Sequence, residues 1–416
     1  MNMSHHSNYV TSRNTTDLGA TLSLGLIFFI VLGFQLIMSM QIDIYELSQT
    51  RVDLMGYWLT FSLSIFLGLR LRNHCRIHIV PLLLVCLLII YIFFVITLTK
   101  PSQSLIAFFI SRYGIIMWFI LGIGFAGFLD IIQKSQQTKY SKITRLITIG
   151  ILIFLGTQVF SFARQYIAFP VQSMNYQAVA SSASIFLLIV ALTIETLWGG
   201  KKPLILSTAY LIVGTVLVVA IVLLQSTSIV VLWIGLAVVF FYKMLADSRF
   251  LVKLTLGIFT AIAIFYFLNS ETFEVITQTT RFNVFFESEG EFSSLSSRLS
   301  IIDSFLYQFA VSPIFGHFEA EIVAGVGQGM YLHSLPLSFL THTGIVGTTL
   351  LLVALTLFLR SRVIHQRGID PIETQIARIM LVILALGSIA TFLTWSVLWF
   401  MMGVLCRRPS IVCERY

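Results

Sequence analysis

The chain has 416 residues, of which 57% are hydrophobic and 11% are charged, and its mean hydropathy is +0.93. Soluble domains carry about a quarter charged residues because polar groups must cover their exterior, so this composition excludes a soluble fold and predicts a protein embedded in lipid. The net charge of +8 comes from Lys and Arg residues in short segments between apolar runs. That distribution argues against a nucleic-acid partner and instead indicates membrane topology.

Apolar runs of about 20 residues, the length that crosses a bilayer as a helix, follow one another along the chain. A last, longer run covers 376–405, and we expect Gly387 together with Thr391 and Thr394 to break it into a tight helical hairpin. The pattern therefore predicts an all-α polytopic membrane protein with about 12 transmembrane helices. The earlier candidate spans are residues 19–39, 54–71, 77–98, 113–132, 146–163, 181–198, 203–224, 229–245, 251–268 and 338–359.

The basic residues between the runs predict how the chain is oriented. Connections rich in Lys and Arg face the cytoplasm, and here the even-numbered connections carry most of them. Arg407 and Arg408 follow the last run directly. We therefore expect a cytoplasmic N-terminus, a cytoplasmic C-terminus and odd-numbered connections on the outer face. The basic residues of the second and fourth connections are Arg70, Arg72, Arg76, Lys134, Lys139, Lys142 and Arg145.

One predicted outer connection, residues 269–337, is much longer than the others. Loops of this length in compact proteins are usually functional. Within it, residues 295–309 have apolar side chains at helical spacing, which predicts an interfacial helix on the membrane surface. The fifth connection, 164–180, is the second polar segment on the predicted outer face. We expect a single transmembrane domain, 1–416, that contains the large loop.

No nucleotide or metal motif accompanies these spans. The sequence contains no Walker A pattern, dinucleotide fingerprint or HExxH. Its four cysteines, Cys75, Cys86, Cys406 and Cys413, have neither CxxC nor metal-ligand spacing. We therefore expect no cofactor, no metal and no disulfide, and any chemistry must use polar groups at the membrane face.

Arginines on the predicted outer face depart from the positive-inside trend. Arg281 and Arg298 lie in the large loop and Arg164 lies in the fifth connection. A guanidinium matches phosphate oxygens as a planar fork, although a salt bridge with the many carboxylates of the loop is the simpler alternative. His333 can accept a proton from a hydroxyl near neutral pH, although a lone interfacial histidine is more often structural. His342 falls within a span, where a structural role is the better interpretation.

The segment from Ser296 to Gly347 resembles the signature region of the bacterial O-antigen polymerase and O-antigen ligase family. The family pattern runs from an Arg, through a Pro-x-x-Gly turn, to a His-Asn or His-Ser pair followed by a Gly-x-x-Gly helix. The plan of about 12 spans with a large outer loop before the last few also resembles the family. The matching residues here are Arg298, Ser312-Pro313-Ile-Phe-Gly316-His317, His333-Ser334 and Gly344-Ile-Val-Gly347.

This resemblance implies a membrane-embedded, metal-independent glycosyltransferase of the bacterial inner membrane, with its site on the periplasmic side. Family members use a glycan on undecaprenyl diphosphate as donor. His333 matches the essential histidine of the family and Arg298 its loop arginine, so these are the expected catalytic residues. The residues expected to bind the diphosphate or glycan are Arg164, which resembles the arginine of the preceding outer loop, Arg281, Asn175 and Tyr176.

The resemblance leaves the acceptor open. A polymerase passes the glycan to another lipid-linked repeat unit and is the favoured interpretation, whereas a ligase passes it to lipid A–core. The implied partners are an undecaprenyl-diphosphate-linked oligosaccharide, an acceptor glycan or lipid A–core, membrane lipid and a chain-length regulator protein. A lipid-linked oligosaccharide flippase is the alternative from another class. Transporters usually bind substrate near the bilayer midplane, whereas these spans are nearly free of charge at their centres.

Overall fold

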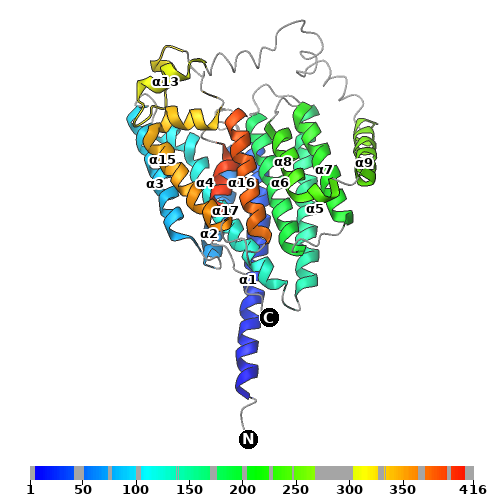
Figure 1. The fold of residues 1–416 in the computed structure, drawn as a ribbon. Helices are drawn as coiled ribbons and strands as arrows, with labels where there is room; N and C mark the ends of the chain where they lie inside the picture. The colour runs from blue at the N-terminus through cyan, green and yellow to red at the C-terminus, as the bar shows by residue number, and fades with distance from the viewer. Residues whose placement is uncertain are drawn as a thin grey trace.

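The computed structural model describes the backbone of residues 5–41, 51–73, 77–99, 105–136, 138, 140–168, 176–198, 204–223, 228–245, 248–267, 303–326, 332, 334–363, 371–390 and 395–407, and the side chains of somewhat narrower ranges. Every named element in these ranges is a helix (Figure 1), which confirms the predicted all-α class. Each predicted span coincides with a helix. The helices are α1 (His5–Gln41), α2 (Arg51–Arg72), α3 (Ile79–Thr99), α4 (Leu105–Ser135), α5 (Ser141–Ala168), α6 (Tyr176–Trp198), α7 (Leu204–Leu223), α8 (Ser228–Leu245), α9 (Ser248–Phe267), α13 (Phe305–Val311), α14 (Ala320–Val323), α15 (Leu335–Val363), α16 (Pro371–Ala390) and α17 (Ser396–Leu405).

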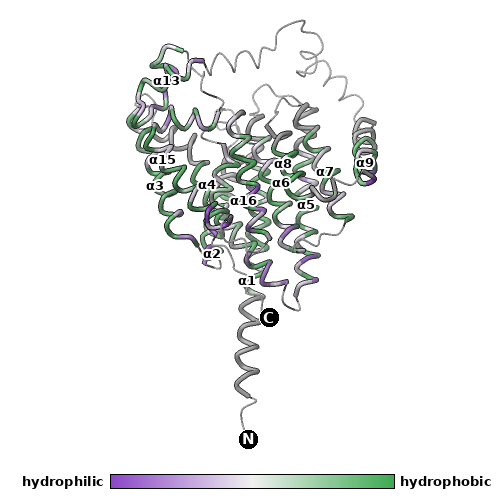
Figure 2. The backbone as a smooth tube through the Cα atoms, viewed as in Figure 1, coloured by the Kyte–Doolittle hydropathy of each residue, from purple (hydrophilic) through white to green (hydrophobic). Residues whose placement is uncertain are grey.

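The outer surface of the bundle is suited to lipid. Along α3, the large apolar side chains of Ile90, Phe94 and Leu98 are exposed, and soluble proteins rarely expose such continuous apolar surface. Apolar residues dominate the helices, and hydrophilic residues gather mainly near the helix ends (Figure 2). The chain is therefore a multi-pass helical membrane protein, while the count of about 12 crossings stays a prediction. The segments in the described residues that are long and apolar enough to cross a membrane are Gly19–Ser39, Ile79–Thr99, Gly114–Ser135, Ser141–Ser161, Val179–Trp198 and Leu335–Arg362.

The last apolar run forms two helices, α16 and α17, in agreement with the predicted hairpin, while its two crossings stay a prediction. Gly387, which was expected to help break the run, instead lies inside α16. The Arg407 Nε atom, just beyond α17, lies 3.1 Å from Oε1 of Glu373 near the start of α16, so α17 runs back along α16 as a hairpin. A helix of this length extends only about 15 Å, roughly half of the hydrocarbon layer. All its residues from Val397 to Leu405 are buried. Helix α17 is thus a short element enclosed by the other helices.

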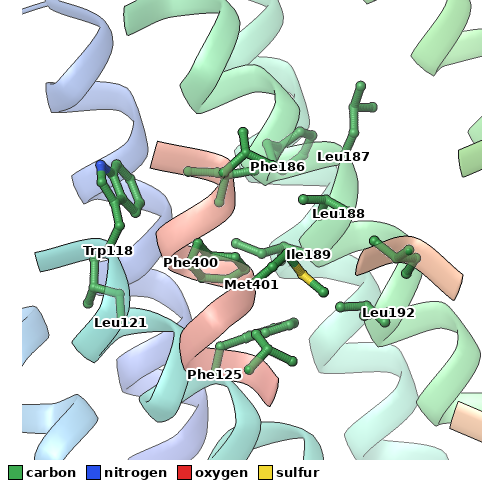
Figure 3. Packing of buried hydrophobic residues seen from close by; sticks show 14 of the residues in the cluster. Trp118, Leu121, Phe125, Phe186, Leu187, Leu188, Ile189, Leu192, Phe400 and Met401 are labelled. Atoms are coloured by element: carbon green, nitrogen blue, oxygen red, sulfur yellow. The ribbon is translucent and has the colours of Figure 1, made fainter. Parts of the chain in front are cut away.

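Glycines allow α4 to pack tightly between α2 and α17. A Cβ on Gly122 would collide with the carbonyl oxygen of Phe400 in α17, and one on Gly124 would lie 2.6 Å from the Cα of Gly68 in α2. Small residues at such crossings let helix backbones approach closely in membrane proteins. Large side chains fill the neighbouring space (Figure 3), and the rings of Phe125 and Phe400 have centroids 5.6 Å apart.

Buried charges join several helix ends at one end of the bundle. The Nε atom of Arg362, at the end of α15, lies 3.0 Å from Oε2 of Glu373. Arg407 Nε lies 2.7 Å from Oδ1 of Asp130 in α4, and Ile77, just before α3, forms an antiparallel bridge with Arg407. We call this region, defined by Asp130, Arg362, Glu373 and Arg407, the ion-paired end.

The ion-paired end agrees with part of the predicted topology. It brings together the second, fourth and tenth connections and the segment after α17, all of which were expected on one side. Helix α1 begins at the same end, because Gly25 packs against Phe128 near the end of α4 whereas Gln35, ten residues on, contacts Met117 in its first half. Which face of the membrane this end occupies stays a prediction of the positive-inside rule.

The described part of the large loop contains the short helices α13 and α14. The helix predicted at 295–309 overlaps α13, which ends slightly later, at Val311, while residues 295–302 lie outside the described residues. Gln308 is the buried side chain of α13, whereas Leu306 and Tyr307 are 70% and 71% exposed. Part of the apolar side of α13 is therefore exposed, as in a helix on a membrane surface, whereas Phe305 and Phe309 are half-buried.

Candidate functional site at the break in helix α15

Two of the sequence motifs meet at an interruption of α15. Gly344 has φ 63° and ψ −170°, so α15 consists of two helical halves separated at this residue. Gly316, in the Pro-x-x-Gly turn, has φ 83°. A Cβ on Gly344 would collide with the Ile314 carbonyl group, and one on Gly316 with the His342 carbonyl group. Positive φ and close backbone contact both require glycine at these two positions.

The turn supplies the hydrogen bonds that the broken helix lacks. The N–H groups of Ile345 and Val346 donate to the carbonyl oxygens of Pro313 and Ile314 over 2.9 and 3.2 Å. In the opposite direction, the N–H of His317 donates to the carbonyl oxygen of Thr341 over 2.9 Å. Because helix ends leave backbone groups without intrahelical partners, the turn caps both halves of α15. We call this contact between residues 312–318 and 341–347 the junction.

Helix α3 supports the junction from the side. The Tyr91 hydroxyl donates to the carbonyl oxygen of Phe315 over 2.8 Å, and the N–H of Phe318 donates to Thr99 Oγ1 over 3.2 Å. Tyr91 was not among the residues predicted from the sequence. A signal was present, since a tyrosine hydroxyl in an otherwise apolar span needs a hydrogen-bond partner. Thr99, at the end of α3, marks what we call the loop end of the bundle, opposite the ion-paired end.

His342 is buried beside the break and is bound to its own helix. Its Nδ1 atom lies 2.8 Å from the carbonyl oxygen of Ser338 and 3.0 Å from the Ser338 hydroxyl. A carbonyl only accepts, so Nδ1 carries the proton and Nε2 carries the lone pair. The ring packs against Phe318, with centroids 5.1 Å apart. These contacts agree with the structural role expected for His342.

His317 has the opposite tautomer. Its Nδ1 accepts a hydrogen bond from the N–H of Glu319 over 3.1 Å, which leaves the proton on Nε2. Burial lowers the pKa of His317 below its ordinary value, and the Glu319 carboxylate partly opposes that shift. The imidazole is therefore neutral at pH 7. The two histidines of the junction thus differ in which ring nitrogen is bound locally, since Nδ1 accepts in His317 and donates in His342.

The predicted site residues themselves fall outside this description. His333, Arg298, Arg281 and Asn175 lie outside the described residues. Arg164 belongs to α5 and Tyr176 begins α6, but their side chains are also outside the described part. Their roles stay predictions.

The immediate neighbours of His333 place it in the chain relative to the junction. Leu332 and Ser334 are both buried, and the carbonyl oxygen of Ser334 accepts the N–H of Ser338 over 2.7 Å in the first turn of α15. In the chain, His333 therefore lies two residues before Leu335, the start of the half-helix whose other end is capped by the turn. That half-helix, Leu335 to Thr343, extends only about 13 Å.

Comparison with known proteins adds no further assignment. No family model, no curated protein and no solved structure matches the chain. The functional assignment therefore rests on the sequence motifs and on the geometry of the junction.

Proposed function

We propose that the protein transfers a glycan from undecaprenyl diphosphate to a sugar hydroxyl at the periplasmic face, as a polymerase of O-antigen or another surface polysaccharide. The single observation that supports this most is that the Pro-x-x-Gly turn and the Gly-x-x-Gly helix of the resembling segment, far apart in sequence, form one junction. Motifs that occur together by chance have no reason to complete each other's hydrogen bonds. The junction also lies at the end of the bundle expected to face outward.

The proposed chemistry needs only side chains of this chain. The acceptor oxygen forms a bond to the anomeric carbon while the bond from that carbon to the diphosphate oxygen breaks. Negative charge develops on the leaving diphosphate, where a guanidinium such as that of Arg298 stabilises it as a preorganised cation. The proton of the acceptor hydroxyl passes to His333 acting as general base.

The junction has a positioning role in this proposal. Arg298 precedes α13 and the turn, whereas His333 precedes the first half of α15. The turn holds the end of that half-helix through the bond from His317 to Thr341, so the described segments that follow Arg298 and His333 in the chain meet at the junction. Reacting groups must be held in register for transfer, because small displacements cost large factors in rate.

An in vitro reaction with the purified protein in lipid nanodiscs tests the proposal and separates its alternatives. A polymerase given only undecaprenyl-diphosphate-linked repeat units forms longer lipid-linked chains and releases undecaprenyl diphosphate. A ligase releases undecaprenyl diphosphate only when lipid A–core is also present. A flippase breaks no bond under either condition, and intact donor under both conditions would contradict the proposal.

A further inference from the structure

We infer that the turn at residues 312–318 is a re-entrant element, which enters the outer part of the hydrocarbon layer and contacts lipid acyl chains through Ile314 and Phe315. The inference rests on the depth of the turn along α3, on the hydrogen bonds of its backbone and on the exposure of its apolar side chains. It does not depend on glycan transfer.

Contacts with α3 give the depth of the turn. Helix α3 extends from Ile79 to Thr99, about 31 Å, which matches the roughly 30 Å thickness of the hydrocarbon layer. The Phe318 N–H binds Thr99 at the end of this helix, but the Phe315 carbonyl binds Tyr91. Tyr91 precedes Thr99 by two helical turns, or about 12 Å. The turn therefore lies alongside the last two turns of a spanning helix.

Most backbone polar groups of the turn are hydrogen-bonded within the protein, as a lipid environment favours. Irregular backbone is tolerated at membrane depth only where its polar groups are satisfied by protein, since no water is present. Here the carbonyl groups of Pro313, Ile314 and Phe315 accept from Ile345, Val346 and the Tyr91 hydroxyl respectively. The N–H groups of Gly316, His317 and Phe318 donate to the Ser312 carbonyl, the Thr341 carbonyl and Thr99 Oγ1. Most backbone groups of the turn are thus paired within the protein, and the exceptions among the described residues include the N–H groups of Ile314 and Phe315.

The exposed side chains of the turn are apolar, which indicates that lipid covers its outer side. Ile314 is 54% exposed and Phe315 is 61% exposed. The Tyr91 bond places them next to the exposed residues Phe94 and Leu98 of α3, and Ile345 of α15 is exposed beside the turn. No charged residue occurs between Ser312 and Gly316. The turn therefore continues the lipid-facing surface of α3 and α15, and the two helices and α13 lie together in Figure 1.

Spin labels on the full-length protein in lipid nanodiscs test this inference. The four native cysteines are replaced by alanine, and single cysteines are introduced by Ile314→Cys and Phe315→Cys. Phe94→Cys serves as the lipid-facing control and Asp303→Cys, an exposed position of the same loop, as the aqueous control. We expect the labels at 314 and 315 to collide more often with oxygen than with a water-soluble nickel chelate, as the label at 94 does. The label at 303 should show the reverse.

Two results would overturn the inference. Accessibility of the 314 and 315 labels to the nickel chelate, as at 303, would place the turn in water. Protection from both reagents would mean that protein, such as a second copy of the chain, covers the turn. Phe315→Trp provides an independent measurement, because acyl chains brominated near the headgroup should quench its added fluorescence while aqueous acrylamide should not.

Discussion

The two ends of the bundle differ in how the polar groups of buried helix ends find partners. At the ion-paired end, Arg362, Glu373 and Arg407 satisfy buried helix ends with charges, and the Arg362 guanidinium also donates to the carbonyl oxygens of Leu405 and Arg407. At the loop end, the junction uses backbone groups and two glycines. The ion pairs connect several helices, and removal of one charged partner leaves the other charge buried and uncompensated. The junction connects one turn to one helix through backbone hydrogen bonds, and a side chain at Gly316 or Gly344 would collide with the facing backbone.

This difference predicts how each end responds to substitution. The expected loss of unfolding free energy is largest for a buried charge, smaller for a glycine of the junction and smallest for a single hydrogen bond. The reason for the order is physical. An uncompensated buried charge costs more than backbone strain at one residue, and strain costs more than one neutral hydrogen bond.

The largest loss is expected for Glu373→Gln. This carboxylate lies between Arg362 and Arg407, and its side chain is fully buried. Removing one partner of a buried ion pair typically costs about 3–5 kcal/mol because the remaining charge is uncompensated. The apparent free energy of unfolding, measured by denaturing detergent titration in micelles, should fall by that amount. Arg360→Gln, at an exposed position two residues before Arg362, is the matched control, and equal stability of the two variants would refute the role of the charges.

A smaller loss is expected for Gly344→Ala. A left-handed backbone costs a non-glycine residue about 1–3 kcal/mol, and the new Cβ also meets the Ile314 carbonyl group. Gly150→Ala in α5 is the control, because a Cβ there has no atom within 4 Å and the change should stabilise the helix slightly. The rate of glycan transfer should fall in Gly344→Ala and stay unchanged in Gly150→Ala. Wild-type stability and transfer in Gly344→Ala would mean that the junction is dispensable.

Tyr91→Phe should have the smallest measurable effect on stability. It removes the hydroxyl that binds the Phe315 carbonyl, and a neutral hydrogen bond contributes about 0.5–1.5 kcal/mol. The exposed Tyr307 offers the control Tyr307→Phe, which should leave the unfolding free energy unchanged. A spin label at position 314 should become more mobile with Tyr91→Phe. No change in its mobility would show that the turn is held without α3.

Much of the helical plan could be predicted from sequence because span length and apolarity are local properties. The division of the last run into two helices was predicted, although Gly387, which was expected to help break it, lies inside α16. The position of the second, fourth and tenth connections at one end of the bundle was predicted from charge alone. The partners at that end could not be predicted, since the pairing of Asp130 with Arg407 depends on how distant helices pack.

The junction illustrates the limit of sequence patterns more clearly. The motifs around Gly316 and Gly344 were recognised separately, and neither indicates that its backbone completes the other. Their contact depends on positive φ angles and on hydrogen bonds between segments far apart in sequence. For His333 and Arg298, the sequence gives residue types and order, and their roles rest on the resemblance.

Two substitutions at the predicted site should leave stability unchanged and affect transfer alone. Arg298→Lys keeps the charge but loses the planar fork that matches two phosphate oxygens, so transfer from the lipid-linked donor should fall. The rate of undecaprenyl diphosphate release by the purified variant measures this. If Arg298 only pairs with a carboxylate of the loop, lysine should substitute well and the length of the product should stay normal.

The most direct test of the account is the rate of glycan transfer by His333→Ala in lipid nanodiscs, measured beside its unfolding free energy. General-base catalysis contributes about 10²- to 10⁴-fold, so transfer should fall by a factor in that range while the protein unfolds like the wild type. Long glycan formed by this variant at a rate near that of the wild type would contradict the account, because the loop end would then lack its proposed base.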